Sequence, residues 1–314
     1  MNRPSFFIAG NSKSGTTALF RFLDAHPAVF MSRPKEPNYF ASDFCHDPNP
    51  SGSFHPITEI EYLALFETAR PDQLCGEASA CYLYSQAAAA AIREFAPDAR
   101  IVVILREPVE FLASYHLQLL QNPVTEGETE RDLATALALE PERRLGDVPN
   151  GCLIPELLYY RERVRYAHHL ERLYESFDKS QVLVLIYEEY ERDNRSAYRD
   201  VIEFLDLDPD FEPDFERHNE GAKLRSRRLQ SAFQKMTHGE TWGASVKAVA
   251  RTTLPRPIRS RLQQAVLERV VFEPKPSFDP EFAAALRAEF APEVERCGSL
   301  IGRDLIGLWG YRAP

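Results

Sequence analysis

Three short apolar runs along the chain predict buried β-strands. They span residues 6–9, 101–105 and 181–186, and each is bounded by turn-forming or polar residues. Runs of this length that are rich in β-branched or aromatic residues favour strands over helices. Because they lack a polar residue at every second position, we expect both of their faces to be covered, as in a parallel sheet.

Amphipathic segments between and after these runs predict helices. The segment Thr16 to Ala25 places Leu19, Phe22 and Leu23 on one face, and Pro27 follows its end. Further helices are expected from Pro108 onward and, as one long helix, from about Pro155 to Phe177. Alternating buried strands and helices predict an α/β fold, a P-loop-type doubly wound parallel sheet flanked by helices.

The strand pattern stops after about Gly221. The sequence beyond it is helical in character, rich in arginine and interrupted by prolines. We therefore expect an α/β domain over 1–220 and a helical C-terminal extension, or lid, over 221–314 that packs on the same domain.

The composition is typical of a globular protein with a sizeable core. Apolar residues make up 44% and charged residues 27% of the 314 residues. No window approaches the roughly 18 apolar residues of a membrane-spanning helix, and the start of the chain lacks the features of a signal peptide. The five cysteines are scattered and odd in number, which suits free thiols in a reducing compartment. We expect a cytoplasmic protein.

The charge is unevenly distributed. The net charge is −10, which argues against general nucleic-acid binding. Residues 223–261, however, hold ten Lys or Arg and one acid, Glu240, so this stretch carries +9 and the rest −19. Such a stretch is either a solvated helical surface or a basic lid over an anionic ligand.

The loop after the first apolar run has the composition of an anion-binding loop. Gly10-Asn11-Ser12-Lys13-Ser14-Gly15-Thr16-Thr17 joins the predicted strand directly to the predicted helix. Loop and first-turn N–H groups converge on one point there, and glycines let the backbone approach a phosphate closely. The nucleotide-triphosphatase loop places lysine after the second glycine, whereas Lys13 precedes Gly15.

A second anion-binding motif follows the second apolar run. Arg106 stands at the carboxyl end of that predicted strand, where open α/β sheets bind ligands. Ser114 follows eight residues later in the next predicted helix. An arginine and a hydroxyl group together suit a phosphate.

The two motifs resemble those of sulfotransferases that use 3′-phosphoadenosine 5′-phosphosulfate (PAPS). Lys13-Ser14-Gly15-Thr16-Thr17 resembles the loop that binds the 5′-phosphosulfate. Arg106-Glu107-Pro108 followed by Ala113-Ser114-Tyr115 resembles the 3′-phosphate motif. The resemblance covers about residues 5 to 228, with the motifs in the family's order, and points to the bacterial branch related to heparan-sulfate-type enzymes.

Segments of lower specificity extend the resemblance to the acceptor side. Lys35-Glu36-Pro37-Asn38-Tyr39-Phe40 is similar to the segment whose glutamate is the general base of the heparan-sulfate-type branch. Gly76 to Tyr82 resembles the E-K-T-P-A-Y segment, although the family's lysine is Ala78 here. The C-terminal K-G-R cofactor loop of the animal enzymes is absent, and Arg225-Ser226 resembles a bacterial segment that would close over PAPS.

The resemblance implies transfer of a sulfuryl group from PAPS to an acceptor hydroxyl or amine of a small molecule, lipid or saccharide. In-line transfer depends on positioning and charge stabilisation. Lys13 would neutralise charge on the leaving oxygen, and Glu36 would take the acceptor proton, with His116 as the rival base. No divalent metal is expected, because the sulfuryl group is singly charged and no histidine pair has ligand spacing.

Two other functions remain open at this point. One is an ATP- and magnesium-dependent P-loop kinase or NTPase, against which the position of Lys13 and the Arg106–Ser114 pair count. The other is a sulfotransferase fold that has lost catalysis and serves as a binding protein, which Ala78 favours and Lys13, Glu36 and Arg106 oppose.

Overall fold

The computed structural model describes residues 2–45, 54, 56–121, 127–150, 152–215 and 279–312. The chain divides into two compact units, Met1–Pro213 with Ser277–Pro314, and Asp214–Pro276. Apart from Asp214 and Phe215, the described residues lie in the first unit. The C-terminal helices of residues 279–312 therefore belong to the same unit as the sheet.

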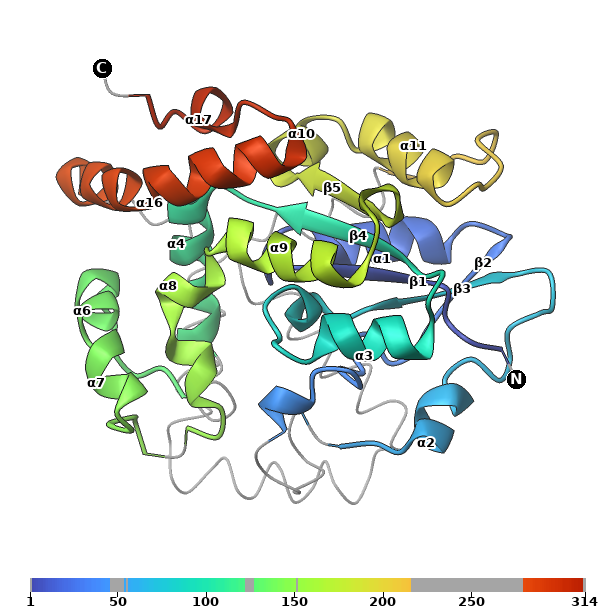
Figure 1. The fold of residues 1–314 in the computed structure, drawn as a ribbon, viewed down its shortest axis with the longest axis horizontal. Helices are drawn as coiled ribbons and strands as arrows, with labels where there is room; N and C mark the ends of the chain where they lie inside the picture. Colours follow the sequence, from blue (N-terminus) through green and yellow to red (C-terminus); the bar gives the residue numbers. More distant parts are fainter. Residues whose placement is uncertain are drawn as a thin grey trace, which may run out of the picture. The chain divides into compact units, whose positions relative to one another are not determined.

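The first unit is built on a five-stranded sheet whose strands are all parallel, as the predicted fold class requires. The strand order is β2-β3-β1-β4-β5 (Figure 1), with β1 at Phe6–Gly10, β2 at Val29–Met31, β3 at Leu74–Ala78, β4 at Arg100–Leu105 and β5 at Val182–Ile186. Strands β1, β4 and β5 coincide with the three apolar runs. The sequence did not predict β2 and β3, which lie on the other side of β1.

Helices cover both faces of the sheet. Phe7 and Ala9 of β1 belong to the main apolar cluster, which they share with side chains of α3 (Ala88–Phe95), α4 (Pro108–Gln121), α9 (Tyr166–Ser176) and α16 (Pro280–Ile301). On the opposite face Phe22 of α1 (Thr16–Asp24) makes edge contacts with Tyr190 of α10 (Tyr187–Arg192) and Tyr198 of α11 (Asn194–Phe204). In Figure 1 α3 and α9 lie in front of the strands and α1 behind them.

Short elements occupy the connections. They are η1 (Ser42–Phe44), α2 (Glu59–Ala64), η2 (Ala80–Leu83), α6 (Leu133–Ala138), α7 (Glu140–Arg144), η3 (Pro155–Leu158), α8 (Tyr160–Arg163), η4 (Lys179–Gln181) and α17 (Leu305–Leu308). Among the described ranges no helix is long and apolar enough to cross a membrane.

The single helix predicted from about Pro155 to Phe177 is wrong, because this stretch forms three separate pieces, η3, α8 and α9. The carbonyl of Arg163, which a continuous helix would pair with the N–H of Ala167, instead accepts a 3.1 Å hydrogen bond from Asn11 Nδ2. The N–H of Ala167 donates to Glu293 Oε1 of α16 at 2.7 Å. Tertiary partners thus replace helical hydrogen bonds, and the helix breaks between α8 and α9.

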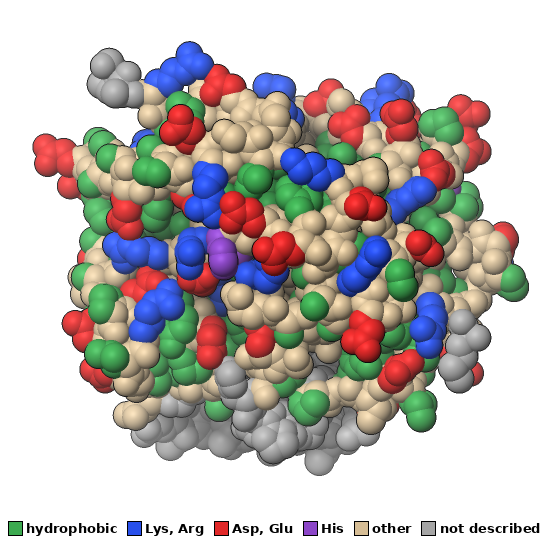
Figure 2. Space-filling view, in the orientation of Figure 1, with side chains coloured by type: hydrophobic (Ala, Val, Ile, Leu, Met, Phe, Trp, Pro, Cys, Tyr) green, Lys and Arg blue, Asp and Glu red, His purple; other side chains and the backbone are tan. Residues whose placement is uncertain are grey.

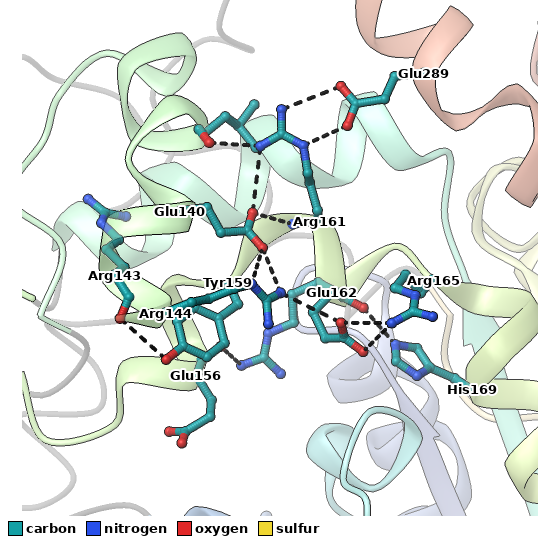
Figure 3. A network of polar contacts seen from close by, with 12 residues as sticks. Glu140, Arg143, Arg144, Glu156, Tyr159, Arg161, Glu162, Arg165, His169 and Glu289 are labelled. Atoms are coloured by element: carbon teal, nitrogen blue, oxygen red, sulfur yellow. Dashed lines mark hydrogen bonds and ion pairs between the residues drawn. The ribbon is translucent and has the colours of Figure 1, made fainter. Parts of the chain in front are cut away.

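Ion pairs hold the broken segment in place (Figure 3). Arg161 of α8 pairs with Glu289 of α16 at 2.6 Å and lies 3.7 Å from Glu140 of α7, which also pairs with Arg144. The neutral His169 ring binds the Glu162 carbonyl through Nε2 at 2.8 Å. Burial lowers the pKa of His169 to about 3, so the ring stays uncharged near neutral pH.

Candidate active site

The candidate site lies along the carboxyl edge of the parallel sheet. Strands that run in the same direction end at the same edge, so the loops after β1, β2, β3 and β4 share it. These loops carry Lys13, Glu36, Ser79 and Arg106 respectively. The strand order changes direction at β1, whose neighbours are β3 and β4, and this is the place where open α/β sheets bind ligands.

The backbone of the loop after β1 requires its glycines. Gly15 has φ of 84°, and a Cβ there would lie 2.7 Å from the ring of Tyr190. At Gly10 a Cβ would lie 2.8 Å from the carbonyl oxygen of Ile104. Lys13 itself adopts φ of 64°. This left-handed turn leads into α1, whose first-turn N–H groups face the loop.

The structure brings the two predicted phosphate motifs into direct contact. Arg106 Nη1 donates a 2.6 Å hydrogen bond to the carbonyl of Lys13, and the guanidinium lies 4.5 Å from the centre of the Tyr187 ring. Tyr166 donates to the Arg106 carbonyl at 2.9 Å, and Asn11 donates to the Tyr166 hydroxyl at 3.3 Å. Hydrogen bonds thus join the loop after β1 and the start of the β4–α4 connection into one assembly.

Polar atoms in this assembly have unused hydrogen-bonding capacity. Ser14 Oγ and Arg106 Nε are buried and have no hydrogen-bond partner among the described residues. Burial, followed by the positive charge of Arg106, lowers the pKa of Lys13. Buried polar groups are ordinarily paired, and two neighbouring cations are stabilised by an anion between them. These features fit a phosphate or sulfate group.

The other residues predicted to bind PAPS have different surroundings. Thr16 is buried at the start of α1 and Thr17 is exposed, while Ser114 is half-buried on α4. Arg225 and Ser226, the predicted lid residues, lie outside the described residues, as does the basic stretch 223–261. On the face shown in Figure 2, basic and acidic side chains are interspersed.

Glu36 lies in the loop after β2 with its carboxylate toward solvent. Its side chain is 46% exposed and forms an ion pair with Lys35. The residue adopts φ of 61°, and its N–H donates to the Ala78 carbonyl at the end of β3 at 3.0 Å. Glu36 is thus held by its backbone and open at its carboxylate, an arrangement that leaves a base accessible to substrate.

His116, the rival base, is engaged in a separate buried network. Its Nδ1 lies 2.7 Å from the Tyr160 hydroxyl and its Nε2 lies 3.1 Å from the Arg131 carbonyl. Tyr160 also donates to Glu128, which binds Arg143 through two hydrogen bonds of 2.8 and 2.9 Å. Both ring nitrogens of His116 have protein partners and the residue is buried, whereas the Glu36 carboxylate is exposed.

A buried carboxylate that the sequence analysis assigned no role lies beside the Glu36 loop. Glu77 of β3 is fully buried and accepts hydrogen bonds from three hydroxyl groups, those of Tyr62, Ser79 and Tyr82, at 2.5, 2.5 and 3.1 Å. Burial raises its pKa to about 7. The signal in the sequence is an acidic residue inside an otherwise small and apolar strand. Among the described residues, no three His, Cys, Asp or Glu side chains gather as metal ligands.

Comparison with known proteins agrees with this geometry. The chain is 29% identical over 211 residues to bovine bifunctional heparan sulfate N-deacetylase/N-sulfotransferase 2, a match of 66% of this chain and 22% of the relative. It is 26% identical over 247 residues to human carbohydrate sulfotransferase 15, covering 66% of this chain and 44% of that protein. The chain thus spans less than half the length of these curated relatives.

A solved structure matches the whole chain. The crystal structure of a sulfotransferase from Alicyclobacillus acidocaldarius superposes with a TM-score of 0.70 at 27% identity, over 99% of this chain and 100% of that one. The family model described as the sulfotransferase domain matches residues 3–245, more than half of the chain. The chain therefore belongs to the sulfotransferase family.

Proposed function

We propose that this chain is an enzyme that transfers the sulfuryl group of PAPS to a hydroxyl or amine of an acceptor. The observation that carries the proposal is the 2.6 Å contact between Arg106 and the Lys13 carbonyl. It joins a loop suited to a 5′-phosphosulfate with an arginine suited to a 3′-phosphate. A nucleotide with phosphate at both positions fits this pair better than ATP, which has no 3′-phosphate.

The unpaired polar atoms support the fit to such a donor. Ser14 Oγ and the loop N–H groups would bind the 5′-phosphosulfate, and Arg106 Nε would bind the 3′-phosphate. When bound, PAPS supplies an activated sulfuryl group. Lys13, already disfavoured as a cation by burial and by Arg106, would gain most from negative charge that develops on the departing phosphate oxygen.

Glu36 would accept the proton of the attacking group. Its carboxylate is paired with Lys35 and open to solvent, and its backbone is tied to β3. The acceptor is a hydroxyl or an amine, and the names of the two curated relatives favour a saccharide. Ala78, fully buried where related enzymes have lysine, indicates that the acceptor is recognised here without that cation.

We infer the compartment in which the enzyme acts from its cysteines. All five are free thiols, which supports a reducing, cytoplasmic compartment.

Thermal unfolding with three nucleotides tests the donor. We expect 3′-phosphoadenosine 5′-phosphate to raise the melting temperature, because a ligand that binds only the folded state stabilises it. Adenosine 5′-phosphate and Mg-ATP should raise it much less at equal concentration. Transfer of radiolabelled sulfur from PAPS to a panel of amino and hydroxyl sugars then tests the reaction. Stabilisation by Mg-ATP alone would overturn the proposal in favour of a kinase or NTPase.

A further inference from the structure

The segment that carries Glu36 is tied to β3 and η2 by a regular set of hydrogen bonds. The N–H groups of Glu36, Asn38 and Phe40 donate to the Ala78 carbonyl, the Ser79 hydroxyl and the Tyr82 hydroxyl, at 3.0, 3.1 and 3.3 Å. The Asn38 side-chain oxygen also accepts from Cys81 Sγ at 3.1 Å. Every second N–H of the segment therefore has a partner on the neighbouring strand or its extension.

Two of these partners are hydroxyl groups whose protons point to the same carboxylate. Ser79 donates to Glu77 Oε1 at 2.5 Å, and Tyr82 donates to Glu77 Oε2 at 3.1 Å. A hydroxyl that donates its one proton to a carboxylate turns its lone pairs elsewhere. Ser79 and Tyr82 can therefore accept from Asn38 and Phe40 because Glu77 takes their protons.

The third hydroxyl on Glu77 provides an internal comparison. Tyr62 donates to Glu77 Oε2 at 2.5 Å, and its ring stacks on Tyr39 at 4.2 Å between centroids. The hydroxyl oxygens of Ser79 and Tyr82 accept hydrogen bonds from the Glu36–Phe40 segment. None of the hydrogen bonds from the segment given above goes to the Tyr62 hydroxyl. Removing the Tyr62 hydroxyl therefore takes one hydrogen bond away from Glu77 but leaves the hydrogen bonds from the Glu36–Phe40 segment in place.

We propose that Glu77 is a positioning residue for sulfuryl transfer: through the hydroxyls of Ser79 and Tyr82 it orders the Glu36–Phe40 segment and thereby places the Glu36 carboxylate. The proposal rests on the proposed function of Glu36 as the base. Glu36 and Asn38 both adopt positive φ, 61° and 54°, a conformation that non-glycine residues hold only when the surroundings fix it. The Ala78 carbonyl holds the N–H of Glu36, and the two hydroxyls hold the N–H groups of Asn38 and Phe40, so the three hydrogen bonds together supply that constraint.

The chemistry of an amide shows why a carboxylate is needed. The ionised carboxylate of Glu77, the form present above its pKa of about 7, accepts from all three hydroxyls. In Glu77→Gln one of its oxygens becomes an NH₂ group, which donates where the hydroxyls also donate. Whichever way the amide is turned, at least one hydroxyl proton loses its acceptor. That hydroxyl then rotates its proton away from the amide. Where the proton points toward an N–H of the Glu36–Phe40 segment, the oxygen no longer accepts from that N–H, and the hydrogen bond to the segment is lost.

Four variants test the proposal: Glu77→Gln, Ser79→Ala, Tyr82→Phe and the control Tyr62→Phe. Two measurements are made on each at pH 8, where Glu77 is largely ionised: kcat for sulfuryl transfer and amide hydrogen exchange of peptides covering residues 36–40. We expect the first three to lower kcat by about 10–10²-fold, the usual cost of a small misplacement, and to speed exchange in 36–40 about fivefold or more. Affinity for 3′-phosphoadenosine 5′-phosphate should stay within about twofold, because the donor contacts lie on other loops.

The control separates positioning from general destabilisation. Tyr62→Phe should leave kcat and exchange in 36–40 near the wild-type values, even if its melting temperature falls as much as that of Tyr82→Phe. Ser79→Thr, which keeps the hydroxyl, should recover part of the activity that Ser79→Ala loses.

Two results would overturn the proposal: unchanged exchange in 36–40 in Ser79→Ala and Tyr82→Phe, or faster exchange with unchanged kcat. Failure of the proposed function would look different. Wild-type protein would then transfer no sulfuryl group and gain no stability from 3′-phosphoadenosine 5′-phosphate, while the exchange measurements would still report on the hydroxyl connections.

Discussion

The hydroxyl of Tyr311 donates a 2.7 Å hydrogen bond to the carboxylate of Glu107, a residue 204 positions earlier in the chain. Glu107 directly follows Arg106, and its N–H donates to Glu188 at 3.0 Å. Glu188 in turn accepts from the Trp309 indole at 2.8 Å. The last described turn of the chain therefore fixes the backbone beside the predicted 3′-phosphate ligand.

Tyr311→Phe should lower the free energy of unfolding by about 1–3 kcal/mol, the cost of leaving a buried group with one hydrogen bond fewer. Burial raises the pKa of Glu107 because the charged carboxylate is poorly solvated. Each hydrogen bond that the carboxylate accepts therefore matters to its stability. Denaturant titration measures the change. Tyr159→Phe is the matched control, because its hydroxyl makes only a 3.5 Å contact with the Arg143 carbonyl. Equal losses in both variants would contradict the role of Tyr311.

The apolar pattern predicted β1, β4 and β5 because these strands are buried on both faces and contain few polar residues. It did not predict β2, which has three residues, or β3, which contains Gly76 and Glu77. A carboxylate inside a strand is stable only with the hydroxyls of Tyr62, Ser79 and Tyr82 around it. The contact with Tyr62 depends on how α2 packs, and no local pattern contains that information.

The sequence motifs indicated Lys13 and Arg106, and the parallel sheet brings them together because β1 and β4 are neighbours. The same motifs could not show that Arg106 donates to the Lys13 carbonyl. They also gave no sign of Tyr311 beside Glu107, since that contact joins residues 204 positions apart in the chain. Helical periodicity similarly missed the break at Arg163, whose carbonyl is bound by the distant Asn11.

Lys13→Ala should reduce kcat by at least about 10²–10³-fold, the usual effect of removing one group that stabilises transition-state charge. The fold should remain, because Lys13 lies in a loop rather than in the apolar core. Circular dichroism and sulfuryl-transfer kinetics check both points. Lys179→Ala is the control, since Lys179 lies before β5 at the opposite edge of the sheet. A Lys13→Ala enzyme with near-normal kcat would remove this residue from the reaction.

Arg106→Ala should weaken binding of 3′-phosphoadenosine 5′-phosphate by about 10–10²-fold, since a hydrogen bond to a charged group contributes about 1.5–3 kcal/mol. Binding of adenosine 5′-phosphate should change much less. Isothermal titration calorimetry compares the two ligands. Arg100→Ala changes an arginine at the other end of the same strand and should affect neither. Equal losses for both nucleotides would mean that Arg106 does not bind the 3′-phosphate.

Glu36→Gln should lower kcat by about 10²–10⁴-fold, the usual contribution of a general base. Glutamine keeps the size of the side chain but cannot take a proton, so affinity for the donor should be unchanged. Glu59→Gln is the control, because Glu59 is a similarly exposed acid paired with a cation, Arg3. If Glu36→Gln stays active and His116→Ala loses kcat without unfolding, His116 is the base.

The pH dependence of stability should reveal the proton on Glu77. Its pKa is raised by burial from 4.5 to about 7 in the folded protein, so between these values the folded state holds a proton that the unfolded state has lost. The neighbouring titratable groups Tyr62, Cys81 and Tyr82 have pKa values raised well above their ordinary ones and stay neutral in this range.

Stability linked to this proton is fully present below pH 4.5 and is lost as the pH rises through about 7. Glu77→Gln removes the titration while keeping the shape of the side chain. The free energy of unfolding of the wild type, minus that of Glu77→Gln, should therefore fall by roughly 3 kcal/mol from low pH to pH 8, at about 1.4 kcal/mol per pKa unit. Denaturant titrations of both proteins from pH 5 to 8 measure most of this difference, and subtraction cancels the carboxylates that they share. A difference that stays flat, or that rises with pH, would show that Glu77 is ionised in the fold throughout this range, because only a carboxyl that binds its proton more tightly in the folded state loses stability as the pH increases.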